Sequence, residues 1–396
     1  MDFHFKPEDE AFREEVRSFL REELPANWDG ADPYGASEGD EGDRGSTWEL
    51  NRRVTKKLAE RRWLAMAWPK EYGGLNAPHM QQLVYNEEMA YQAAPGGGGM
   101  GVAWVGPAIM LYGTDDQKQR YLPRITSGED IWCTLYSEPE AGSDLASLQT
   151  RAVEDGDDFV INGQKIWTSI ADRSNWGWLA ARTDPEAPKH KGVSTFVVPM
   201  DAPGITIRPL INIAGQRGFN EVFFDNVRIP KENLVGELNR GWYHVAVALD
   251  FERSGIQAYA GGRRTLERLV SYVQEQPESA RRNPALRIRL ADRAVEVATG
   301  TYIAYRIPWM QSQGVIPNYE ASISKLFGSE LSQRLAHTGL QLLGMYGALE
   351  TGSKWAPLKG RLERAYLTAV ASTIAAGTSE VQRSIIATRG LGLSRG

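Results

Sequence analysis

The spacing of apolar residues changes twice along this chain of 396 residues, and these changes constrain its fold more than any other feature. From about Ile131 to Leu238 the period is strand-like, and no helix of useful length interrupts it, whereas the period on both sides is helical. Strands that follow one another without helices favour an antiparallel sheet over a βαβ dinucleotide fold. The sequence therefore predicts an α+β protein: an N-terminal helical domain over 1–130, a middle antiparallel, barrel-like β-domain over 131–240 and a C-terminal four-helix-bundle-type domain over 241–396.

Local signals locate the expected elements within this frame. An exposed loop is expected over Asp29–Ser46, and the glycines of Ala94–Gly101 disfavour a helix. Asn162-Gly163 predicts a hairpin turn inside Asp157–Trp167, and Ser379 with Gln382 has the form of a capping box. Helices are expected over 5–20, 47–62, 80–91, 242–262, 264–275, 286–311, 319–343, 361–374 and 379–388, and further strands over 176–182, 193–199, 205–210 and 221–229.

Composition excludes several classes of function. The formal net charge of −5 argues against a nucleic-acid partner. No apolar run approaches the roughly 20 residues of a membrane span, and the acidic N-terminus lacks a secretory signal, so a cytoplasmic location is expected. Cys133 is the single cysteine, which excludes an internal disulfide, and the five histidines are scattered, so no protein-ligated metal is expected.

Three segments carry recognisable motifs: YSEPEAGSDLASL over 136–148, VINGQKIWTS over 160–169 and AAGTSEVQRSII over 375–386. With GQRGFNEVFFDNVRIPKENLVGELNRGW between the last two, they resemble the acyl-CoA dehydrogenase family over essentially the whole chain. The resemblance implies FAD as cofactor, an acyl-CoA substrate of fatty-acid or steroid-side-chain β-oxidation and an electron-transferring flavoprotein as electron acceptor. It also implies a proton taken from the α-carbon and a hydride passed from the β-carbon to flavin N5.

The same resemblance implies residues around the flavin. The backbone of Tyr136, the hydroxyl of Ser137 and Ser169 correspond to groups that donate to the ring, and Trp167 corresponds to an indole beside it. Donors at the polar edge of a flavin hold charge as the ring is reduced. The alternatives are a turn hydroxyl for Ser137 and a packed strand aromatic for Trp167. Ser143 corresponds to a residue that contacts the CoA pyrophosphate; its alternative is a helix N-cap.

Two further segments correspond to the cofactor's adenosine half. Gly377, Thr378 and Glu380 match a GTSE segment that passes near it. QLLGMYG, with Gln341 and Gly344, resembles the segment through which one subunit of the family reaches its neighbour's flavin. The resemblance therefore implies an oligomer, either a dimer or a tetramer.

The catalytic base departs from the commoner family pattern. Many members carry a glutamate directly before the GT motif, where this chain has Ala376. A smaller branch, including isovaleryl- and long-chain-type enzymes, carries it after the β-domain, and LDFERSGI places Glu252 there with Arg253 beside it. A carboxylate in a dry pocket suits removal of a weakly acidic α-proton, because burial raises its pKa. Asp250 is the rival base, and a solvated surface pair is the alternative for Glu252 and Arg253.

A second departure concerns the Arg-x-x-Phe-Gly segment whose arginine binds the FAD pyrophosphate in most members. An ungapped alignment places Val273, Gln276 and Pro277 at those positions, and Arg281 or Arg282 could substitute. Similar losses occur in bacterial steroid-side-chain dehydrogenases of the family, which are heteromers of two related subunits. Retention of QLLGMYG favours a homo-oligomer, and the missing arginine favours a related second subunit.

Alternative functions remain open at this level. The missing arginine raises the possibility of a catalytically silent or half-site subunit of a hetero-oligomer. The same fold can also serve acyl-CoA oxidases and flavin monooxygenases, and no residue distinguishes these from a dehydrogenase. The glycine-rich segment over 95–101 corresponds to the lining of the family's acyl pocket, where absent side chains would leave room for a bulky acyl group; a flexible connector is the alternative.

Overall fold

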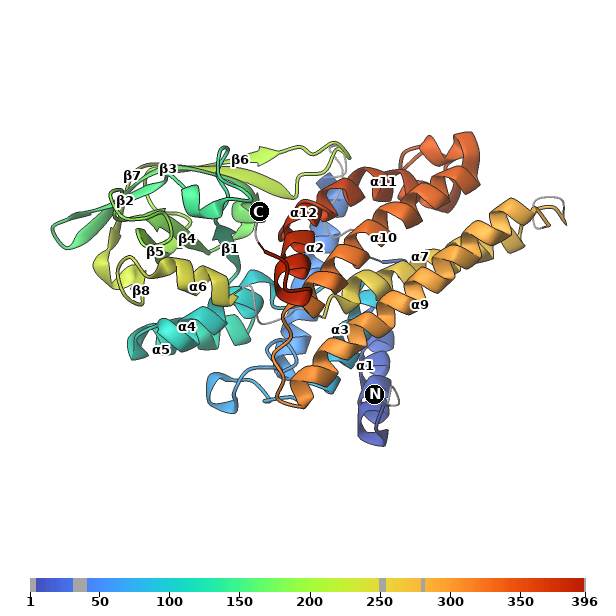
Figure 1. Ribbon diagram of the computed structural model, residues 1–396, viewed down its shortest axis with the longest axis horizontal. Coiled ribbons are helices and arrows are strands. Elements are labelled where there is room, and N and C mark those ends of the chain that lie inside the picture. The colour runs from blue at the N-terminus through green and yellow to red at the C-terminus, as the bar shows by residue number, and fades with distance from the viewer. Residues whose placement is uncertain (1–4, 31–40, 249–253, 279–281, 395–396) are drawn as a thin grey trace. The chain divides into compact units, whose positions relative to one another are not determined.

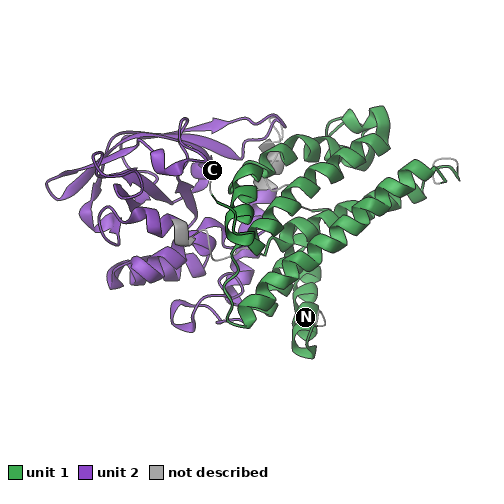
Figure 2. Cartoon of the chain, viewed as in Figure 1, with its two compact units in different colours: residues 1–31, 78–94, 253–396 green, residues 32–77, 95–252 purple. Residues whose placement is uncertain are grey.

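The computed structural model describes residues 5–30, 41–248, 254–278 and 282–394, with side chains left out at 41–46 and 246–248. Its elements are labelled in Figure 1. The chain divides into two compact units, coloured in Figure 2: unit 1 contains 1–31, 78–94 and 253–396, and unit 2 contains 32–77 and 95–252. Segments far apart in the sequence therefore build one helical unit.

Unit 1 consists of helices that pack side by side around an apolar interior. Tyr259, Val297 and Leu331 are buried there, each from a different helix, together with Leu83 and Leu335. Helical spacing of these residues places them on one face of each helix, which is the face that the neighbours cover. The helices are α1 (Pro7–Glu23), α3 (His79–Tyr91), α7 (Ile256–Gln274), α9 (Pro284–Ser312), α10 (Tyr319–Leu343), α11 (Arg361–Ser372) and α12 (Ser379–Ile385).

Two helix bounds expected from the sequence, both next to glycines, differ from those in unit 1. The expected single helix over 242–262 is wrong, because Ser254 and Gly255 are not helical: α6 is described over Gly241–Ala248, and α7 begins after Gly255, which has a φ of +68°. The expected stop near Gly262 is also wrong, because α7 continues through it. A Cβ on Gly262 would lie 3.1 Å from Leu335, and one on Gly300 of α9 would lie 2.0 Å from the Tyr259 ring. Here glycine permits contact between helices without ending one.

Unit 2 is built on an eight-stranded sheet. The strand order is β6-β7-β3-β2-β4-β5-β8, with β1 paired to β4. The sheet is mainly antiparallel as expected, but β1 runs parallel to β4, with Trp132 opposite Trp176. The strands are β1 (Trp132–Leu135), β2 (Arg151–Asp155), β3 (Asp158–Ser169), β4 (Trp176–Arg182), β5 (Val193–Pro199), β6 (Ile205–Leu210), β7 (Phe219–Pro230) and β8 (Leu234–Val235).

The hairpin turn expected at Asn162-Gly163 is absent from the described strands, because β3 runs straight through both residues. The turn lies earlier, where Asp155 of β2 pairs with Asp158 of β3. Gly163 adopts a φ of +150° at a register shift against β7, and a Cβ there would lie 2.5 Å from the Thr150 hydroxyl. The Asn-Gly pair thus lies at a bulge within β3 and not at a hairpin turn, and glycine inside a strand often marks such a bulge.

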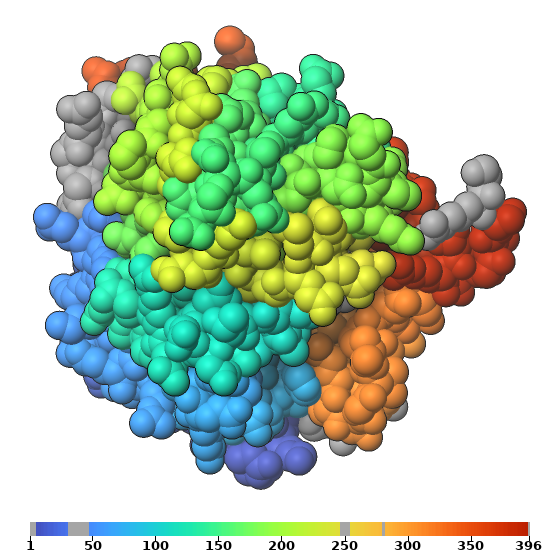
Figure 3. All heavy atoms as spheres, turned by 90° about the vertical axis from the view of Figure 1, so that its left-hand side faces the viewer, coloured from blue at the N-terminus to red at the C-terminus, as the bar shows by residue number. Residues whose placement is uncertain are grey.

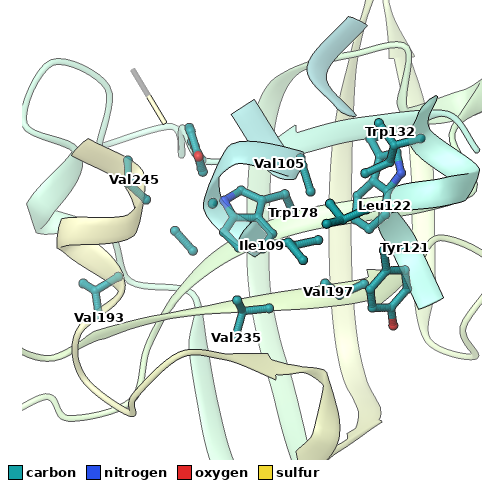
Figure 4. Close-up of a cluster of buried hydrophobic side chains, with 14 of the residues drawn as sticks. Val105, Ile109, Tyr121, Leu122, Trp132, Trp178, Val193, Val197, Val235 and Val245 are labelled. Atoms are coloured by element: carbon teal, nitrogen blue, oxygen red, sulfur yellow. The ribbon is translucent and has the colours of Figure 1, made fainter. Parts of the chain in front are cut away.

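The sheet is buried on both faces at β4 and β5, because their side chains alternate between two apolar clusters. On β4, Trp178 and Ala180 enter one cluster, and Leu179 and Ala181 enter the other. Figure 4 shows the first cluster, in which Trp178 meets side chains from helices and neighbouring strands. Both clusters lie within unit 2, so apolar packing covers the two faces of the sheet around β4 and β5.

The α-helices described in unit 2 are α2 (Glu41–Glu60), α4 (Gly106–Tyr112), α5 (Asp115–Thr126) and α6 (Gly241–Ala248). Thr114 and Gln117 form a capping box at the start of α5, and Gln117 also donates to the carbonyls of Glu232 and Leu234 at 2.7 and 2.9 Å. The two segments lie side by side in Figure 3. Within the expected loop over 29–46, α2 already begins at Glu41, and 31–40 lie outside the described residues.

The capping register of α12 differs from the expected one. Thr378, not Ser379, is the N-cap, and its hydroxyl accepts from the Val381 amide at 3.2 Å. The Ser379 hydroxyl is buried and has no hydrogen-bond partner among the described residues. Among the helices that the structure describes, none is long and apolar enough to span a membrane.

Candidate functional site

In unit 2, the SEP loop (136–138) is held against β3 by a buried lysine. The Lys165 side chain is fully buried, and its Nζ donates to the Tyr136 carbonyl at 3.0 Å and to Glu138 Oε1 at 2.8 Å. The Ile166 amide donates to the Ser137 carbonyl at 2.9 Å. These three bonds place the loop that carries Tyr136 and Ser137 beside the strand that leads to Trp167.

Glu138 completes this buried ion pair. Its carboxylate accepts from the backbone amides of Gln149 and Thr150 at 2.6 and 2.9 Å. Burial raises the pKa of Glu138, but the charge of Lys165 and the three hydrogen bonds to the carboxylate outweigh it and hold that pKa below its usual range. Burial lowers the pKa of Lys165 to about 8, although Glu138 opposes this change. The pair is therefore ionised at neutral pH and ties three backbone segments together.

Tyr136 lies at the inner side of the loop. Its ring stacks on Trp104 at a centroid distance of 6.2 Å and an interplanar angle of 6°. Burial raises the pKa of its phenol well above the usual value, so this group does not serve as a proton acceptor. Ser137 is half-buried next to it. Tyr136 is thus held by the Lys165 bond to its carbonyl and by the stacking of its ring on Trp104.

Trp167 stands at the end of β3 in an unusual conformation. Its φ is +61°, its side chain is 58% exposed, and its ring makes an edge contact with Phe219 at a centroid distance of 6.1 Å. A packed strand aromatic would be buried, so that alternative is contradicted. A left-handed backbone is rare and strained at a bulky residue, which makes Trp167 a candidate functional position.

The residues after Trp167 add polar groups at the same strand end. Thr168 is buried, and its Oγ1 has no hydrogen-bond partner within the described part of the chain, while its carbonyl accepts from Asn220 at 3.1 Å. Ser169 is half-buried next to it. An exposed indole face together with hydroxyls of Ser137, Thr168 and Ser169 fits a flat ring with polar edges, which is the chemistry of a flavin.

Ser143 lies exposed in the turn that precedes a 3₁₀ helix (Leu145–Ser147). The N-cap of that helix is Asp144, and no side chain caps it, so the alternative of Ser143 as an N-cap is contradicted. Asp144 instead forms an exposed ion pair with Lys189 at 2.8 Å. The role of Ser143 with substrate stays a prediction.

In unit 1, Gln341 lines a hollow of about 550 Å³ between α9, α10 and α11. Its Oε1 accepts from Arg289, and its Nε2 lies 2.7 Å from His337 Nε2. Gly344 follows at the end of α10 with a φ of +58°, a conformation that suits glycine. The hollow is lined by Arg289, Arg293, Gln333, Arg334, His337, Thr338, Gln341, Tyr366 and Val370.

Thr378 and Glu380 line a second hollow of about 390 Å³ that shares Gln333 and Arg334 with the first. Thr378 caps α12, and Glu380 is exposed in its first turn. The turn before them is strained towards the left-handed region, with φ values of +53° at Ala376 and +89° at Gly377. The structure thus brings together, within unit 1, three residues that the motifs placed near the cofactor separately.

The predicted catalytic residues Glu252 and Arg253, and the rival base Asp250, lie outside the described residues. Their neighbours are described: the Ser254 carbonyl accepts from the Ser324 hydroxyl at 2.6 Å, and Gly255 begins α7. Unit 2 ends at Glu252 and unit 1 resumes at Arg253. The role of Glu252 stays a prediction.

The structure shows what occupies the place of the missing arginine. Val273 is buried against the interior of unit 1, and Gln276 donates to the Tyr272 carbonyl at 3.1 Å. Arg282, one proposed substitute, is exposed and paired with Glu278 at 2.6 Å, and Arg281 lies outside the described residues. Val273 and Gln276 carry no charge, and the charge of Arg282 is already paired with Glu278. None of the three therefore supplies a free positive charge in place of the family arginine.

Sequence reasoning missed two groups of this site. Lys165 and Glu138 stand inside the recognised motifs, and a lysine between the strand residues of 160–169 could have indicated a buried cation that needs a partner. Arg289 gives no comparable signal, because it is one of several arginines on α9 and 52 residues separate it from Gln341.

Comparisons with known proteins give a consistent result. Family models match consecutive parts of the chain: acyl-CoA dehydrogenase, N-terminal domain over residues 6–129, middle domain over 133–227 and C-terminal domain over 239–391. Acyl-CoA dehydrogenase FadE26 of Mycobacterium tuberculosis is 35% identical over 413 residues, with 100% of this chain and 99% of the relative covered.

Two solved structures are similar over their whole length. The ChsE4-ChsE5 complex from Mycobacterium tuberculosis has a TM-score of 0.89 at 34% identity, covering 100% of both chains. The Tcur3481-Tcur3483 steroid ACAD has a TM-score of 0.88 at 34% identity, again covering 100% of both chains.

Proposed function

The chain belongs to the acyl-CoA dehydrogenase family, and from this premise we propose that it removes a proton and a hydride from adjacent carbons of an acyl-CoA thioester with Glu252 as the base. Enzymes of this family are FAD-dependent flavoproteins that act on CH–CH groups in fatty-acid and steroid β-oxidation. When bound, FAD supplies the acceptor for the two electrons. The observation that carries the proposal is the pairing of the SEP loop with β3, which presents Trp167 and the hydroxyls around it.

Glu252 is supported as the base by the residue at position 376, where many family members carry the catalytic glutamate. Ala376 has no group that can take a proton, and its φ of +53° places a methyl group in a strained turn. A carboxylate at 252 meets the need for an acceptor near the working pH when burial raises its pKa. Arg253 is the adjacent charge that would tune this pKa, and Asp250 is the residue to test next.

The acyl group is proposed to be bulky, of the steroid-side-chain type. One similar structure is named a steroid ACAD, and another is a complex of two chains from Mycobacterium tuberculosis. In this chain, Gly97 and Gly99 have positive φ and would meet nothing within 4 Å if they carried a Cβ. Absent side chains in this segment leave space that a large acyl group can use.

The active form is proposed to be an oligomer that passes its electrons to an electron-transferring flavoprotein. Retention of Gln341 and Gly344 supports a homo-oligomer, whereas the buried Val273 in place of the arginine supports a related second subunit that completes the site. These two forms predict different behaviour of the chain purified alone.

The first test is visible absorbance of the chain purified alone, followed anaerobically while short, branched, long and steroid-type acyl-CoAs are added. We expect a flavin spectrum that one acyl-CoA bleaches, most strongly the steroid type. A colourless chain that takes up no FAD would instead indicate a subunit that needs its partner. Rapid re-oxidation of the bleached complex by air would indicate an oxidase or a monooxygenase.

Substitution of the proposed base gives the sharpest test of the chemistry. Glu252→Gln keeps the size of the side chain but cannot accept the proton, so turnover should fall by roughly a hundred- to ten-thousandfold. The flavin spectrum and the affinity for acyl-CoA should stay as in the wild type. Asp250→Asn serves as the matched control; loss of turnover in that variant with normal Glu252→Gln turnover would assign the base to Asp250.

A further inference from the structure

The chain directly after the proposed base is fixed by a buried hydrogen bond from another helix. Ser254 lies two residues after Glu252, and its carbonyl accepts from the Ser324 hydroxyl of α10 at 2.6 Å. Ser324 is 1% exposed and Ser254 is 8% exposed, so water has little access to replace this bond. The Ser254 hydroxyl also accepts from the Ile256 amide at 3.4 Å. Ser254 is therefore held both through its backbone and through its side chain.

Gly255, the next residue, leaves room for this contact. Its φ of +68° is a conformation that favours glycine, and a Cβ there would lie 3.0 Å from the Ser324 Oγ atom. A side chain at this position would therefore press on the hydroxyl that reaches the Ser254 carbonyl. The residue at which the chain turns into α7 is thus one that lets α10 approach the backbone closely.

Tyr259 of α7 holds Ser324 in turn. Its phenol donates to the Ser324 carbonyl at 2.7 Å, and its oxygen lies 3.5 Å from Ser324 Oγ. Burial raises the pKa of Tyr259 to about 12, so the phenol stays protonated and can donate at neutral pH. A Cβ on Gly300 of α9 would lie 2.0 Å from its ring, and one on Gly328 of α10 would lie 3.2 Å from its oxygen. The ring therefore fills a slot that two glycines provide.

Covalent geometry ties the proposed base to this anchor. Two residues of extended chain span at most about 7 Å, so the Cα atom of Glu252 cannot lie farther than that from the Cα atom of Ser254. A reacting group that is misplaced by about 1 Å can cost about a hundredfold in rate. A shift of the backbone at Ser254 is therefore expected to reach the proton transfer.

We propose that Ser324 is a positioning residue for Glu252, and that Tyr259 supports it. The inference rests on the proposed function, because it takes Glu252 as the base. The Ser324 hydroxyl fixes the backbone that follows the base, and the Tyr259 phenol fixes Ser324 against α7. Neither group takes up the α-proton, which passes to the carboxylate of Glu252. Both act through the chain that carries this carboxylate.

The direct test is the rate constant of flavin reduction by acyl-CoA, measured by anaerobic stopped flow on the flavin-loaded protein. Ser324→Ala should slow reduction by roughly ten- to a hundredfold, with the flavin spectrum and the dissociation constant of acyl-CoA as in wild type. Tyr259→Phe keeps the ring and the Ser324 hydroxyl, so its loss should be smaller. Ser332→Ala is the matched control: this hydroxyl donates to the Gly328 carbonyl within α10 at 3.0 Å, so the rate should not change.

A double variant separates positioning from a merely structural role. In the Glu252→Gln background, Ser324→Ala should cause no further loss, because the group through which Ser324 acts is absent. The same fold-loss in both backgrounds would overturn the inference. If Ser324→Ala does not hold FAD, Tyr259→Phe is measured in the two backgrounds in its place and is judged by the same criterion.

Failure of this inference is distinct from failure of the proposed base. Slow reduction in Glu252→Gln together with the wild-type rate in Ser324→Ala would overturn the positioning role alone. Reduction at the wild-type rate in Glu252→Gln would overturn the base and the positioning role with it. Slow reduction in both single variants, without additivity in the double variant, is the result that we expect.

Discussion

At the scale of single residues, Lys165 shows how one buried side chain can position a loop. It is a fully buried cation whose bonds reach the Tyr136 carbonyl and Glu138, and thereby hold the loop that presents Ser137. Removing one partner of a buried pair leaves the other charge unpaired, which is far more costly than removing both. Lys165 is therefore a positioning residue for the SEP loop against β3.

The prediction for this pair is a double-mutant cycle. Lys165→Met should lower the free energy of unfolding by about 3–5 kcal/mol, because Glu138 stays buried without its cation. Glu138→Gln in the same chain should restore a large part of that loss. The measurement is urea unfolding followed by tryptophan fluorescence. Equal and additive losses in the two single variants would show that the pair does not act as a unit.

His244 is predicted to weaken the fold in acid. It is buried, its Nδ1 lies 2.8 Å from the Thr195 hydroxyl, and it stacks on Tyr112 at 4.1 Å. Burial, helped by Arg240, lowers its pKa from 6.5 to about 4. Between pH 6.5 and about pH 4, His244 is therefore protonated in the unfolded chain but neutral in the folded chain. The free energy of unfolding falls by about 3 kcal/mol as the pH is lowered through this window.

The check is the free energy of unfolding of wild type and His244→Asn between pH 4 and 7. The asparagine amide can replace the bond to Thr195 but does not titrate, so the difference between the two profiles should shrink as the pH falls. A constant difference over the whole range would show that His244 does not titrate in this window.

At the scale of elements, the start of α12 decides how the GTSE segment is presented. Thr378→Ala removes the bond to the Val381 amide and should cost about 1 kcal/mol of stability. Ser379→Ala removes a hydroxyl that bonds nothing among the described residues, so its cost should be smaller or absent. Thermal unfolding of the two variants compares them directly. A larger loss of stability in Ser379→Ala than in Thr378→Ala would show that Ser379, the residue expected from the sequence, is the N-cap.

At the scale of the whole molecule, α9 presents apolar residues that the chain itself leaves exposed. Ile288, Val295, Tyr302 and Trp309 recur every seven residues, with exposed fractions of 62%, 66%, 51% and 37%. A seven-residue repeat keeps side chains on one face of a helix. An exposed apolar row of this length predicts contact with another chain, as the proposed oligomer requires.

The corresponding prediction concerns molecular mass in solution. Val295→Glu combined with Tyr302→Glu should shift the chain towards a smaller assembly in size-exclusion chromatography with light scattering, because charges cannot be buried at an apolar contact without a partner. Ile316→Glu is the control, since Ile316 is 89% exposed and lies outside α9. An unchanged mass in the double variant would place the interface elsewhere.

Much of the fold follows from local pattern alone. The helix over 319–343 and the strands over 176–182, 193–199 and 205–210 have the bounds expected from the sequence, because periodic apolar residues define them without outside help. The expectations failed at glycines. Asn162-Gly163 is a bulge and Gly262 lies inside a helix, since a glycine serves turns and close packing equally well and only the neighbouring element selects between them.

The sequence by itself determined the order of helices and strands, the family and the motif residues that point to a flavin and an acyl-CoA. Tertiary structure alone decided which polar groups meet. Lys165 and Glu138 are 27 residues apart, and Arg289 and Gln341 are 52 residues apart, so no local pattern specifies either contact. The physical reason is that periodicity records which face of an element is buried, whereas pairing depends on the register in which separate elements pack.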